Sequence, residues 1–492
     1  MAEQTRVQTG VPGLDDILAG GLPRHRMYLV QGDPGVGKTT LGLQFLLEGQ
    51  RQGETGLYAA LSETREELNA VARSHGWSLE GLHFHEMSTE AIGDDDNTLY
   101  VPDDVELGER MSALLAQVDR DKPSRIVLDS CTELRLLAQS PLRFRRQLLA
   151  LKANLVQRRC TILLLDNPVN YGGDPLLQSL VHGVIAMDQL SPLYGSERRR
   201  LRVSKLREVQ FRGGYHDFRI MHDGVEVFPR LVAAEHSQSF ERVPVSSGIA
   251  GLDHLLGGGF DYGTSTLLLG PAGSTKSALA THYAVEAART GRQAAMFVFD
   301  ESLESLFARS TGIGIPLREQ VDSGRITLRR VDPAELAPGE FAHLVRQEVE
   351  VHGARMIVID SLNGYRQAMP EEQFLTLQLH ELLSYLGQMG VATIMVMAQH
   401  GLLMTGEGAV DLSYLADNVI LFRYFEAEGR VRRAISVVKK RSGRHENTIR
   451  EIALGADGFQ FGPPLEQFSG ILTGTPRFRG AAREGRLLGG DG

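Results

Sequence analysis

The sequence predicts an α/β fold in which two similar domains follow one another, each with a mostly parallel central sheet flanked by helices. Two observations support this prediction. The segment TGVPGLDDILAGGL at 9–22 returns as SGIAGLDHLLGGGF at 247–260, and both copies continue into a strand, a glycine-rich loop and a helix. In each half, short apolar runs alternate with amphipathic stretches, which is typical of parallel strands buried between helices.

The spacing of matched residues indicates how far each domain extends. Lys38 and Lys276 lie 238 residues apart, as do Glu63 and Glu301. A repeat of this length is a whole domain, because solenoid repeats are far shorter. We therefore expect a first domain at 1–230, a polar linker at 231–246, a second domain at 247–475 and a Gly- and Arg-rich tail at 476–492.

Each expected element has a local reason. Runs rich in β-branched or bulky apolar residues predict the first domain's strands, at 27–32, 56–62, 125–130 and 161–166. Amphipathic stretches between them predict helices at 65–77 and 142–159. The same strand pattern returns in the second domain at 265–270, 294–300, 356–361 and 393–399.

The charge balance, the cysteine count and the lack of long apolar runs limit the classes of protein to which this chain can belong. The 52 Lys and Arg against 61 Asp and Glu give a net charge of −9, which disfavours a general nucleic-acid or membrane binder. Two cysteines, Cys131 and Cys160, cannot build a disulfide framework and favour a reducing cytoplasm. No run of 18 apolar residues exists, and the N-terminal residues lack the layout of a signal peptide. We therefore expect a cytoplasmic protein.

The first glycine-rich loop, GDPGVGKT at 32–39, matches G-x-x-x-x-G-K-[ST] between a strand and a helix. Its glycines let successive N–H groups face phosphates, and the helix N-terminus adds partial positive charge. Lys38 is expected to reach the β- and γ-phosphates and Thr39 to hold Mg²⁺. The predicted nucleotide-binding residues are Gly32, Gly35, Gly37, Lys38, Thr39 and Thr40.

The second loop, GPAGSTKS at 270–277, departs from the pattern because Thr275 stands where the second glycine belongs. If that position needs a positive φ, threonine costs about 1–3 kcal/mol. One interpretation is a relic loop that binds nucleotide weakly or not at all. The retained lysine and hydroxyl favour binding, through Gly270, Gly273, Ser274, Thr275, Lys276 and Ser277.

An apolar strand that ends in aspartate follows each loop, at Asp129 and at Asp360. Carboxylates at such strand ends line the ligand crevice of an open α/β sheet. With Thr39 and Ser277, they are the predicted Mg²⁺ ligands. The competing interpretation is an aspartate that only caps the next turn.

Hydrolysis also needs a group that orients or deprotonates the attacking water. The candidates follow the second strand of each domain: Ser62 and Glu63 in the first, Asp300 and Glu301 in the second. The competing interpretation is helix capping, because Ser62 and Asp300 are good N-cap residues. Both roles can coexist.

These features resemble the KaiC family, the circadian clock ATPase and kinase together with its homologues. The resemblance covers about residues 5–475 and rests on the G-[VI]-x-G-L-D openings and on SETREELNAVARSHGW, KLR, KKRSGRHEN and FSGILTGTPR. It implies two tandem RecA-like P-loop NTPase domains that bind ATP and Mg²⁺ in a two-tiered homohexamer. It also implies a KaiB-like or signalling protein as partner. Residues at the family's trans-acting positions are Lys205, Arg207, Lys439, Arg441 and His445.

Basic residues alternate in the segments 198–209 and 432–444, so on a strand they would share one face. Their recurrence in both halves favours contact with a neighbour's nucleotide. A solvated edge strand that carries protective charges would look the same.

The resemblance further implies serine autokinase and autophosphatase activity in the second domain. The family's acceptor Ser-Thr pair falls on VDLSYLADNVILF, where Ser413 is present and Tyr414 replaces threonine. Ser413 is therefore the expected sole acceptor, Tyr414 is expected to pack in the core, and a two-site phosphorylation cycle is not expected. The competing interpretation is that Ser413 is an ordinary polar residue. The family's pair of adjacent glutamates falls on Ser62-Glu63 and Asp300-Glu301, so the two domains are expected to differ in chemistry.

Three functions are therefore considered. The leading one is a hexameric ATPase with autokinase activity, acting as a timing or signalling switch. A DNA recombination or helicase ATPase is the second, although the acidic balance and the lack of a basic or zinc-bearing module oppose it. The third is a nucleotide-dependent scaffold with an inactive second domain, which Thr275 favours and the Asp300-Glu301 pair opposes.

Overall fold

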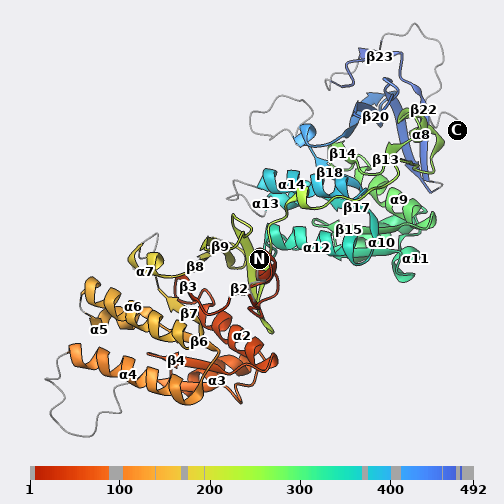
Figure 1. Cartoon of the computed structure of the whole chain (residues 1–492). Helices are drawn as coiled ribbons and strands as arrows, with labels where there is room; N and C mark the ends of the chain where they lie inside the picture. Colours follow the sequence, from red (N-terminus) through yellow and green to blue (C-terminus); the bar gives the residue numbers. More distant parts are fainter. Residues whose placement is uncertain are drawn as a thin grey trace. The chain divides into compact units, whose positions relative to one another are not determined.

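The computed structural model describes residues 6–87, 103–138, 140–167, 175–192, 194–367, 375–399, 412–456, 458–472 and 477–478. The expected tail at 476–492 lies outside these ranges except for Arg477–Phe478. The chain divides into two compact units, residues 1–230 and 231–492. They are coloured from red to yellow-green and from green to blue in Figure 1.

A nine-stranded sheet forms the centre of the first unit, in the order β11-β10-β9-β8-β3-β7-β6-β4-β5. Strands β3 to β8 run parallel, and β9, β10 and β11 extend the sheet as antiparallel neighbours. The strands are β3 (Met27–Gly32), β4 (Gly56–Ala60), β5 (His83–Glu86), β6 (Arg125–Asp129), β7 (Thr161–Asp166), β8 (Gly183–Leu190), β9 (Arg198–Leu206), β10 (His216–Met221) and β11 (Gly224–Phe228). A separate ribbon pairs β1 (Arg6–Val7) with β2 (Leu22–Pro23).

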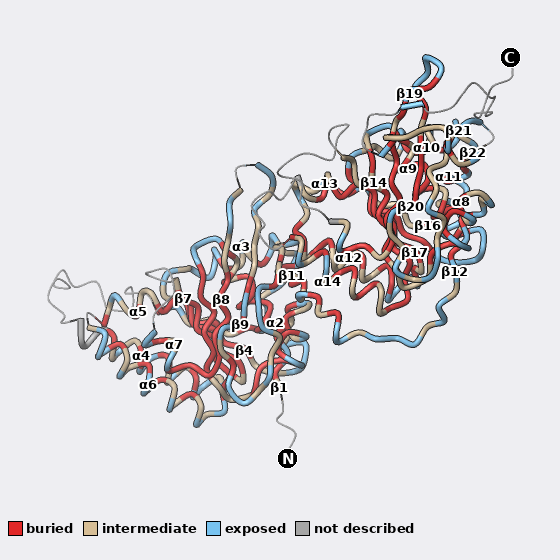
Figure 2. Tube along the Cα trace, turned by 90° about the horizontal axis from the view of Figure 1, so that it is seen from above, coloured by how far each residue is buried: buried red, intermediate tan, exposed pale blue. Residues whose placement is uncertain are grey.

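Helices cover both faces of this sheet, so its central strands are buried on both sides, as the red tube in Figure 2 shows. One core lies under α1 (Leu14–Ile17), α2 (Lys38–Arg51) and α3 (Arg65–Ser74). The other lies under α4 (Asp103–Asp121), α5 (Cys131–Ala138), α6 (Pro141–Gln157) and α7 (Pro175–Leu180).

The second unit repeats this plan, with the strand order β16-β15-β17-β18-β14-β19-β20-β21-β22. The strands are β14 (Ser265–Gly270), β15 (Gln293–Val298), β16 (Ile326–Arg330), β17 (Ala354–Asp360), β18 (Ala392–Ala398), β19 (Asn418–Ala427), β20 (Arg430–Lys440), β21 (Arg450–Gly455) and β22 (Gly458–Pro464). Two short ribbons pair β12 (Pro244–Val245) with β13 (Phe260–Asp261) and β23 (Phe468–Ser469) with β24 (Arg477–Phe478). The prediction of tandem α/β units with mostly parallel sheets is confirmed.

The helices of the second unit again form two layers. One layer holds α8 (Ala250–Leu255), α9 (Lys276–Arg289), α10 (Leu303–Gly312) and α11 (Leu317–Asp322). The other holds α12 (Pro338–Glu350), α13 (Leu362–Gln367), α14 (Leu375–Gln388) and the 3₁₀ turn η3 (Ala233–Glu235). Leu231 and Ala233, from the segment expected to link the domains, are buried in this second core.

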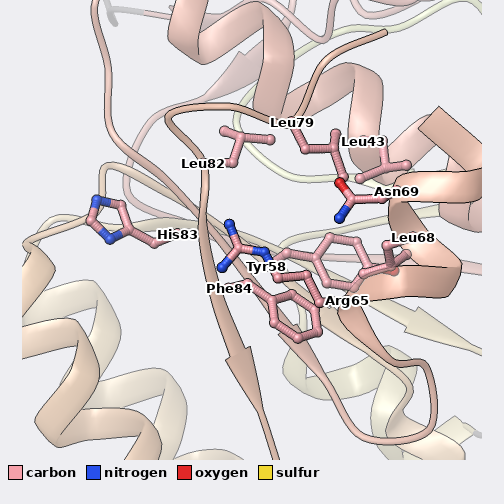
Figure 3. Close-up of a pocket in the computed structure, with 9 residues that line it drawn as sticks. All are labelled: Leu43, Tyr58, Arg65, Leu68, Asn69, Leu79, Leu82, His83 and Phe84. Carbon is pink, nitrogen blue, oxygen red and sulfur yellow. The ribbon is translucent and has the colours of Figure 1, made fainter. Parts of the chain in front are cut away.

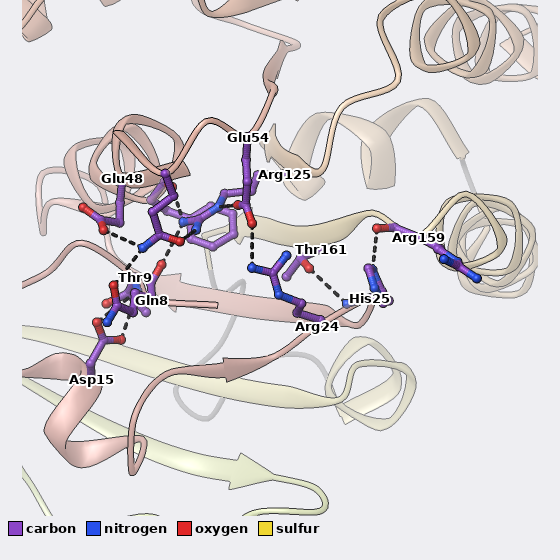
Figure 4. A network of polar contacts seen from close by, with 12 residues as sticks. Gln8, Thr9, Asp15, Arg24, His25, Glu48, Glu54, Arg125, Arg159 and Thr161 are labelled. Atoms are coloured by element: carbon purple, nitrogen blue, oxygen red, sulfur yellow. Dashed lines mark hydrogen bonds and ion pairs between the residues drawn. The ribbon is translucent and has the colours of Figure 1, made fainter. Parts of the chain in front are cut away.

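A buried arginine fixes the loop-bearing helix α2 to the sheet (Figure 4). Arg125 of β6 is fully buried, pairs with Glu54 at 2.5 Å, and donates to the carbonyl oxygens of Gln8 and Phe45 at 2.7 and 2.8 Å. Gly49 is required beside it, because a Cβ there would lie 2.6 Å from the arginine Cδ. The network ties the N-terminal segment, the second half of α2 and β6 together.

Two helices are capped by other residues than those considered in the sequence. The N-cap of α3 is Thr64, which forms a capping box with Glu67, and the N-cap of α10 is Ser302. The capping interpretation of Ser62 and Asp300 is therefore wrong. Both residues lie between strand and helix, where their side chains remain available to the site.

Within the part of the chain that the structure describes, no helix is both long enough and apolar enough to cross a bilayer.

Candidate nucleotide-binding sites

The first glycine-rich loop connects β3 to α2 and leaves a concave stretch of backbone. Gly35 and Gly37 adopt φ values of 82° and 108°, which favour glycine. A Cβ at Gly35 would meet nothing within 4 Å, whereas one at Gly37 would lie 2.8 Å from Ile220 of β10. The loop is thus open at Gly35 and closely packed at Gly37, as expected for backbone that approaches a ligand.

Lys38 begins α2 beneath this loop. Its Nζ donates to the carbonyl oxygens of Gly32 at 2.7 Å and Asp33 at 2.9 Å. Burial lowers its pKa, while Asp129 and Asp166 act in the opposite direction. A desolvated ammonium held by two carbonyl oxygens has a strong electrostatic reason to bind phosphate.

Asp129 ends β6 and lies beside the start of α2. Its Oδ2 accepts hydrogen bonds from Thr39 at 3.0 Å and from Tyr58 at 2.6 Å. Burial raises the pKa of Asp129, although these two hydrogen bonds oppose the shift. A buried carboxylate of this kind gains from an adjacent cation.

Tyr58 belongs to β4, and its ring also lines a small apolar recess under α3 (Figure 3). Leu43, Leu68, Leu82 and Phe84 line the same recess. Burial raises the pKa of the Tyr58 hydroxyl well above its usual range, so the group stays a hydrogen-bond donor. Tyr58 therefore fixes the orientation of Asp129 from the interior.

Glu63 in the first unit has a carboxyl group whose pKa is raised. Burial, followed by the charge of Asp129, raises its pKa to about 7. Ser62 donates to its Oε2 at 3.3 Å. A carboxylate with a pKa near neutrality suits a general base that takes a proton from water.

The second loop joins β14 to α9 and keeps a positive φ at both matching positions, Gly273 and Thr275, despite its substitution. Thr275 has a φ of 71°, so it occupies the left-handed conformation that the sequence raised as a cost. Lys276 donates to the carbonyl oxygen of Pro271 at 2.7 Å and to the hydroxyl of Ser274 at 3.3 Å. Burial lowers the pKa of Lys276 to about 8, against the opposing charge of Asp360.

The metal-side pair is also repeated. Ser277 donates to Oδ1 of Asp360 at 3.1 Å, matching Thr39 and Asp129. Burial raises the pKa of Asp360 to about 6, while Ser277 and Arg309 lower it. This buried acid therefore also favours a nearby cation.

The two carboxylates after β15 have separate partners. The hydroxyl of Ser361 donates to Asp300. Glu301 forms an ion pair with Arg309 of α10, with Nη2 at 2.8 Å from Oε2 and Nε at 3.3 Å from Oε1. The second unit therefore holds its acids differently from the first.

Hydroxyl and carboxylate oxygens beside a phosphate loop are the donor set that Mg²⁺ prefers. Thr39 with Asp129, and Ser277 with Asp360, supply one such pair in each unit. Among the described residues, no group of three or more His, Cys, Asp or Glu side chains could hold a metal ion by itself. An ion at these sites would therefore also need phosphate oxygens and water, so the residues fit Mg²⁺ bound together with ATP.

The basic strands β9 and β20 lie inside their sheets, so the interpretation as edge strands is wrong. Lys205 donates to the carbonyl oxygens of Gln178 and Val181 at 2.6 and 2.8 Å. Lys439 makes the equivalent contacts with Ser413 and Ala416 at 2.9 and 2.6 Å. In the single chain these two ammonium groups thus anchor the turn that precedes β8 or β19.

Of the other residues at the predicted trans positions, the two arginines are the more accessible. Arg207 is exposed and His445 is half-buried. Arg441 is 59% exposed at its side chain, and it contacts Asp417 at 3.2 Å and the carbonyl oxygen of Tyr414 at 3.2 Å.

Ser413 and Tyr414 lie in the 3₁₀ turn η4 (Leu412–Tyr414). Ser413 is half-buried, with its carbonyl oxygen held by Lys439. Tyr414 is 55% exposed, so the interpretation that it packs in the core is wrong. An exposed phenol next to Ser413 leaves two hydroxyl groups at this turn.

Sequence reasoning missed several residues that shape these sites. Tyr58 and Ser361 lie in or just after a strand and orient Asp129 and Asp300. Arg309 stands eight residues after Glu301, at the position that Val71 occupies in the first repeat. A position-by-position comparison of the two repeats would have identified Arg309, whereas nothing in the chain marks Tyr58 as a partner of the acid.

Another missed feature belongs to the first unit alone. Asp166 ends β7, is buried, and pairs with Arg135 at 2.9 Å. The second unit has Met397 at the position that matches Asp166 in register, and Asn363 bonds the backbone of the next residue, Ala398. The first site is therefore richer in acidic groups around Lys38.

Comparison with known proteins agrees with these observations. The model of the KaiC ATPase domain matches residues 7–232 and again 245–466. The chain is 26% identical over 502 residues to the circadian clock protein KaiC3 of Synechocystis sp., which covers 98% of this chain and 97% of the relative. It is 27% identical over 490 residues to the circadian clock oscillator protein KaiC of Synechococcus elongatus, which covers 96% and 92%.

The two matched regions coincide with the two repeated loops, strand-end acids and basic strands. Together they span most of the 492 residues. The chain therefore belongs to the KaiC ATPase family, with two tandem ATPase domains.

Proposed function

We propose that this protein hydrolyses ATP with Mg²⁺ in its first domain and uses ATP for serine autophosphorylation in its second, as a hexameric timing or signalling switch. The observation that carries the proposal is the raised pKa of Glu63, about 7, beside a complete phosphate loop and a buried Asp129. Family membership supports ATPase activity in general.

In this proposal, Lys38 and the loop N–H groups bind the phosphates of ATP, and Thr39 and Asp129 hold Mg²⁺. When bound, Mg²⁺ neutralises charge on the β- and γ-phosphates. The carboxylate of Glu63 takes a proton from water as the water oxygen attacks the γ-phosphorus and the bond to ADP breaks. Ser62 donates to Glu63 and so restricts its orientation.

The second domain supports phosphoryl transfer through a similar set of residues. Lys276, Ser277 and Asp360 repeat the binding groups. Asp300 is our proposed base for the acceptor, because both oxygens of Glu301 already accept hydrogen bonds from Arg309. A serine hydroxyl is a weak nucleophile and needs such a carboxylate during transfer.

We expect Ser413→Ala to remove the phosphate label while ATP hydrolysis continues, because hydrolysis in the first domain does not use Ser413. Incubation with γ-labelled ATP, followed by mass spectrometry of the phosphosite and ADP measurement, tests this. Ser323→Ala, on an exposed residue after α11, serves as a control that keeps the label. Label on Tyr414, or on Thr405 outside the described residues, would contradict the assignment.

ATP should also drive assembly, since Arg207 and Arg441 are accessible to a neighbour's nucleotide and Lys205 and Lys439 can exchange their backbone contacts for phosphate. Light scattering with a non-hydrolysable ATP analogue should show a larger particle than without it. Arg207→Ala should weaken this response, and Arg146→Ala, at an exposed position of α6, should not. A monomer both with and without the analogue would refute the trans contacts.

A scaffold with an inactive second domain remains the second candidate function. The ion pair of Glu301 with Arg309 favours it, because a carboxylate engaged in this way is less available as a base. If Lys276→Ala removes nucleotide from the second domain but lowers neither ADP formation nor phosphorylation of the protein, the second domain is such a scaffold.

A further inference from the structure

The contact between Glu301 and Arg309 is the clearest difference between the two sites. Arg309 lies on α10 and presents two N–H donors, one to each oxygen of the Glu301 carboxylate. Both side chains are 29% exposed, so the pair lies at the rim of the site. Two parallel donors from one guanidinium fix the plane of a carboxylate as well as its position.

The first unit has the same frame without the cation. From the loop lysine to the helix after the second strand, the two repeats keep one constant spacing, which matches the N-caps Thr64 and Ser302. At this spacing Arg309 corresponds to Val71, which packs against the first core. Glu63 therefore receives one hydrogen bond from Ser62, and the guanidinium has no counterpart on α3.

Arg309 acts on more than one acid. Besides its ion pair with Glu301, Arg309 acts electrostatically on Asp360 at the end of β17. It therefore offsets the mutual repulsion of three carboxylates from β17 and from the segment after β15. An ion pair that is partly exposed to solvent adds little to folding stability, so its main effect falls on the orientation and availability of Glu301.

We propose that Arg309 is a positioning residue that restrains Glu301 and thereby slows hydrolysis of ATP in the second unit. In hydrolysis, the water oxygen bonds to the γ-phosphorus, the bond to ADP breaks, and a carboxylate receives the proton. With Glu301 held by Arg309, water lacks that acceptor, and ATP persists for transfer to an acceptor hydroxyl that Asp300 deprotonates. This inference rests on the proposed ATP binding in the second unit.

The test uses the full chain in a Glu63→Gln background, which suppresses hydrolysis in the first unit and keeps its loop intact. Arg309→Val copies the residue of the first repeat. We expect it to raise single-turnover ADP formation per bound nucleotide about tenfold or more, with the roughly 10²–10⁴-fold that a general base supplies as the upper limit. Arg309→Lys, which keeps the charge and loses the paired donors, should give a smaller increase.

Two comparisons make the result specific. Arg346→Val removes an equally shielded ion pair on α12, with Glu350 at 2.9 Å, and should leave the rate unchanged. Adding Glu301→Gln to Arg309→Val should abolish the gain, because the gain passes through Glu301. If two nucleotides are bound and Arg309→Val leaves the rate of ADP formation unchanged or lowers it, this inference is wrong but the proposed function stands. The same holds if the gain in rate survives Glu301→Gln. A protein that binds only one nucleotide per chain overturns the proposed function of the second unit as well.

Discussion

Lys38→Ala should lower the number of bound nucleotides from two per chain to one and remove most ATP hydrolysis. The lysine is desolvated and its Nζ already sits at the carbonyl oxygens that frame the loop. Removing one partner of a buried charged contact costs about 2–5 kcal/mol. That loss corresponds to about 30- to 5,000-fold in Kd for the first site.

The measurement is nucleotide released from the denatured protein after desalting, together with steady-state ADP formation. Lys152→Ala is the matched control, because Lys152 also donates to a carbonyl oxygen, that of Leu180 at 2.6 Å, away from the loop. Lys276→Ala should likewise remove one nucleotide but spare most hydrolysis. Two nucleotides retained in Lys276→Ala would mean that the second loop is a relic.

The parts of these sites that depend on local sequence could be predicted. The phosphate loops, the strand-end positions of Asp129 and Asp360, and the demand for positive φ at Thr275 all follow from short patterns. These features depend on backbone geometry within a few residues, which is what such patterns encode.

Features that depend on distant partners could not be predicted. The contacts of Tyr58 with Asp129 and of Lys439 with Ser413 join segments that meet only through sheet order and register. The places of the antiparallel strands β9 to β11 and β20 to β22 in their sheets could not be predicted either. A strand in which charged residues alternate with others can lie at the edge of a sheet or inside it. Capping residues were misplaced by two positions, since Thr64 and Ser302 compete with equally suitable neighbours.

Glu63→Gln should lower ATP hydrolysis by the first unit by about 10²–10⁴-fold, the usual contribution of a general base. Glutamine keeps the size and can still accept the hydrogen bond from Ser62, but it cannot take a proton. Nucleotide should stay bound, because Lys38 and the loop are untouched. Steady-state ADP formation and the bound-nucleotide count, measured in Lys276→Ala protein, separate catalysis from binding.

The dependence of ATP hydrolysis on pH is a second, independent test of Glu63 as the general base. The pKa of Glu63 is raised to about 7, chiefly by burial and then by the charge of Asp129. Below that pH the carboxylate is protonated and cannot accept a proton from water, so hydrolysis by the first unit should rise as pH increases through about 7. Glu63→Gln should flatten this rise, whereas Glu67→Gln, on the exposed capping residue of α3, should leave it in place. A rise that persists unchanged in Glu63→Gln would assign the titration to another group, and Glu63 would lose its role as the base.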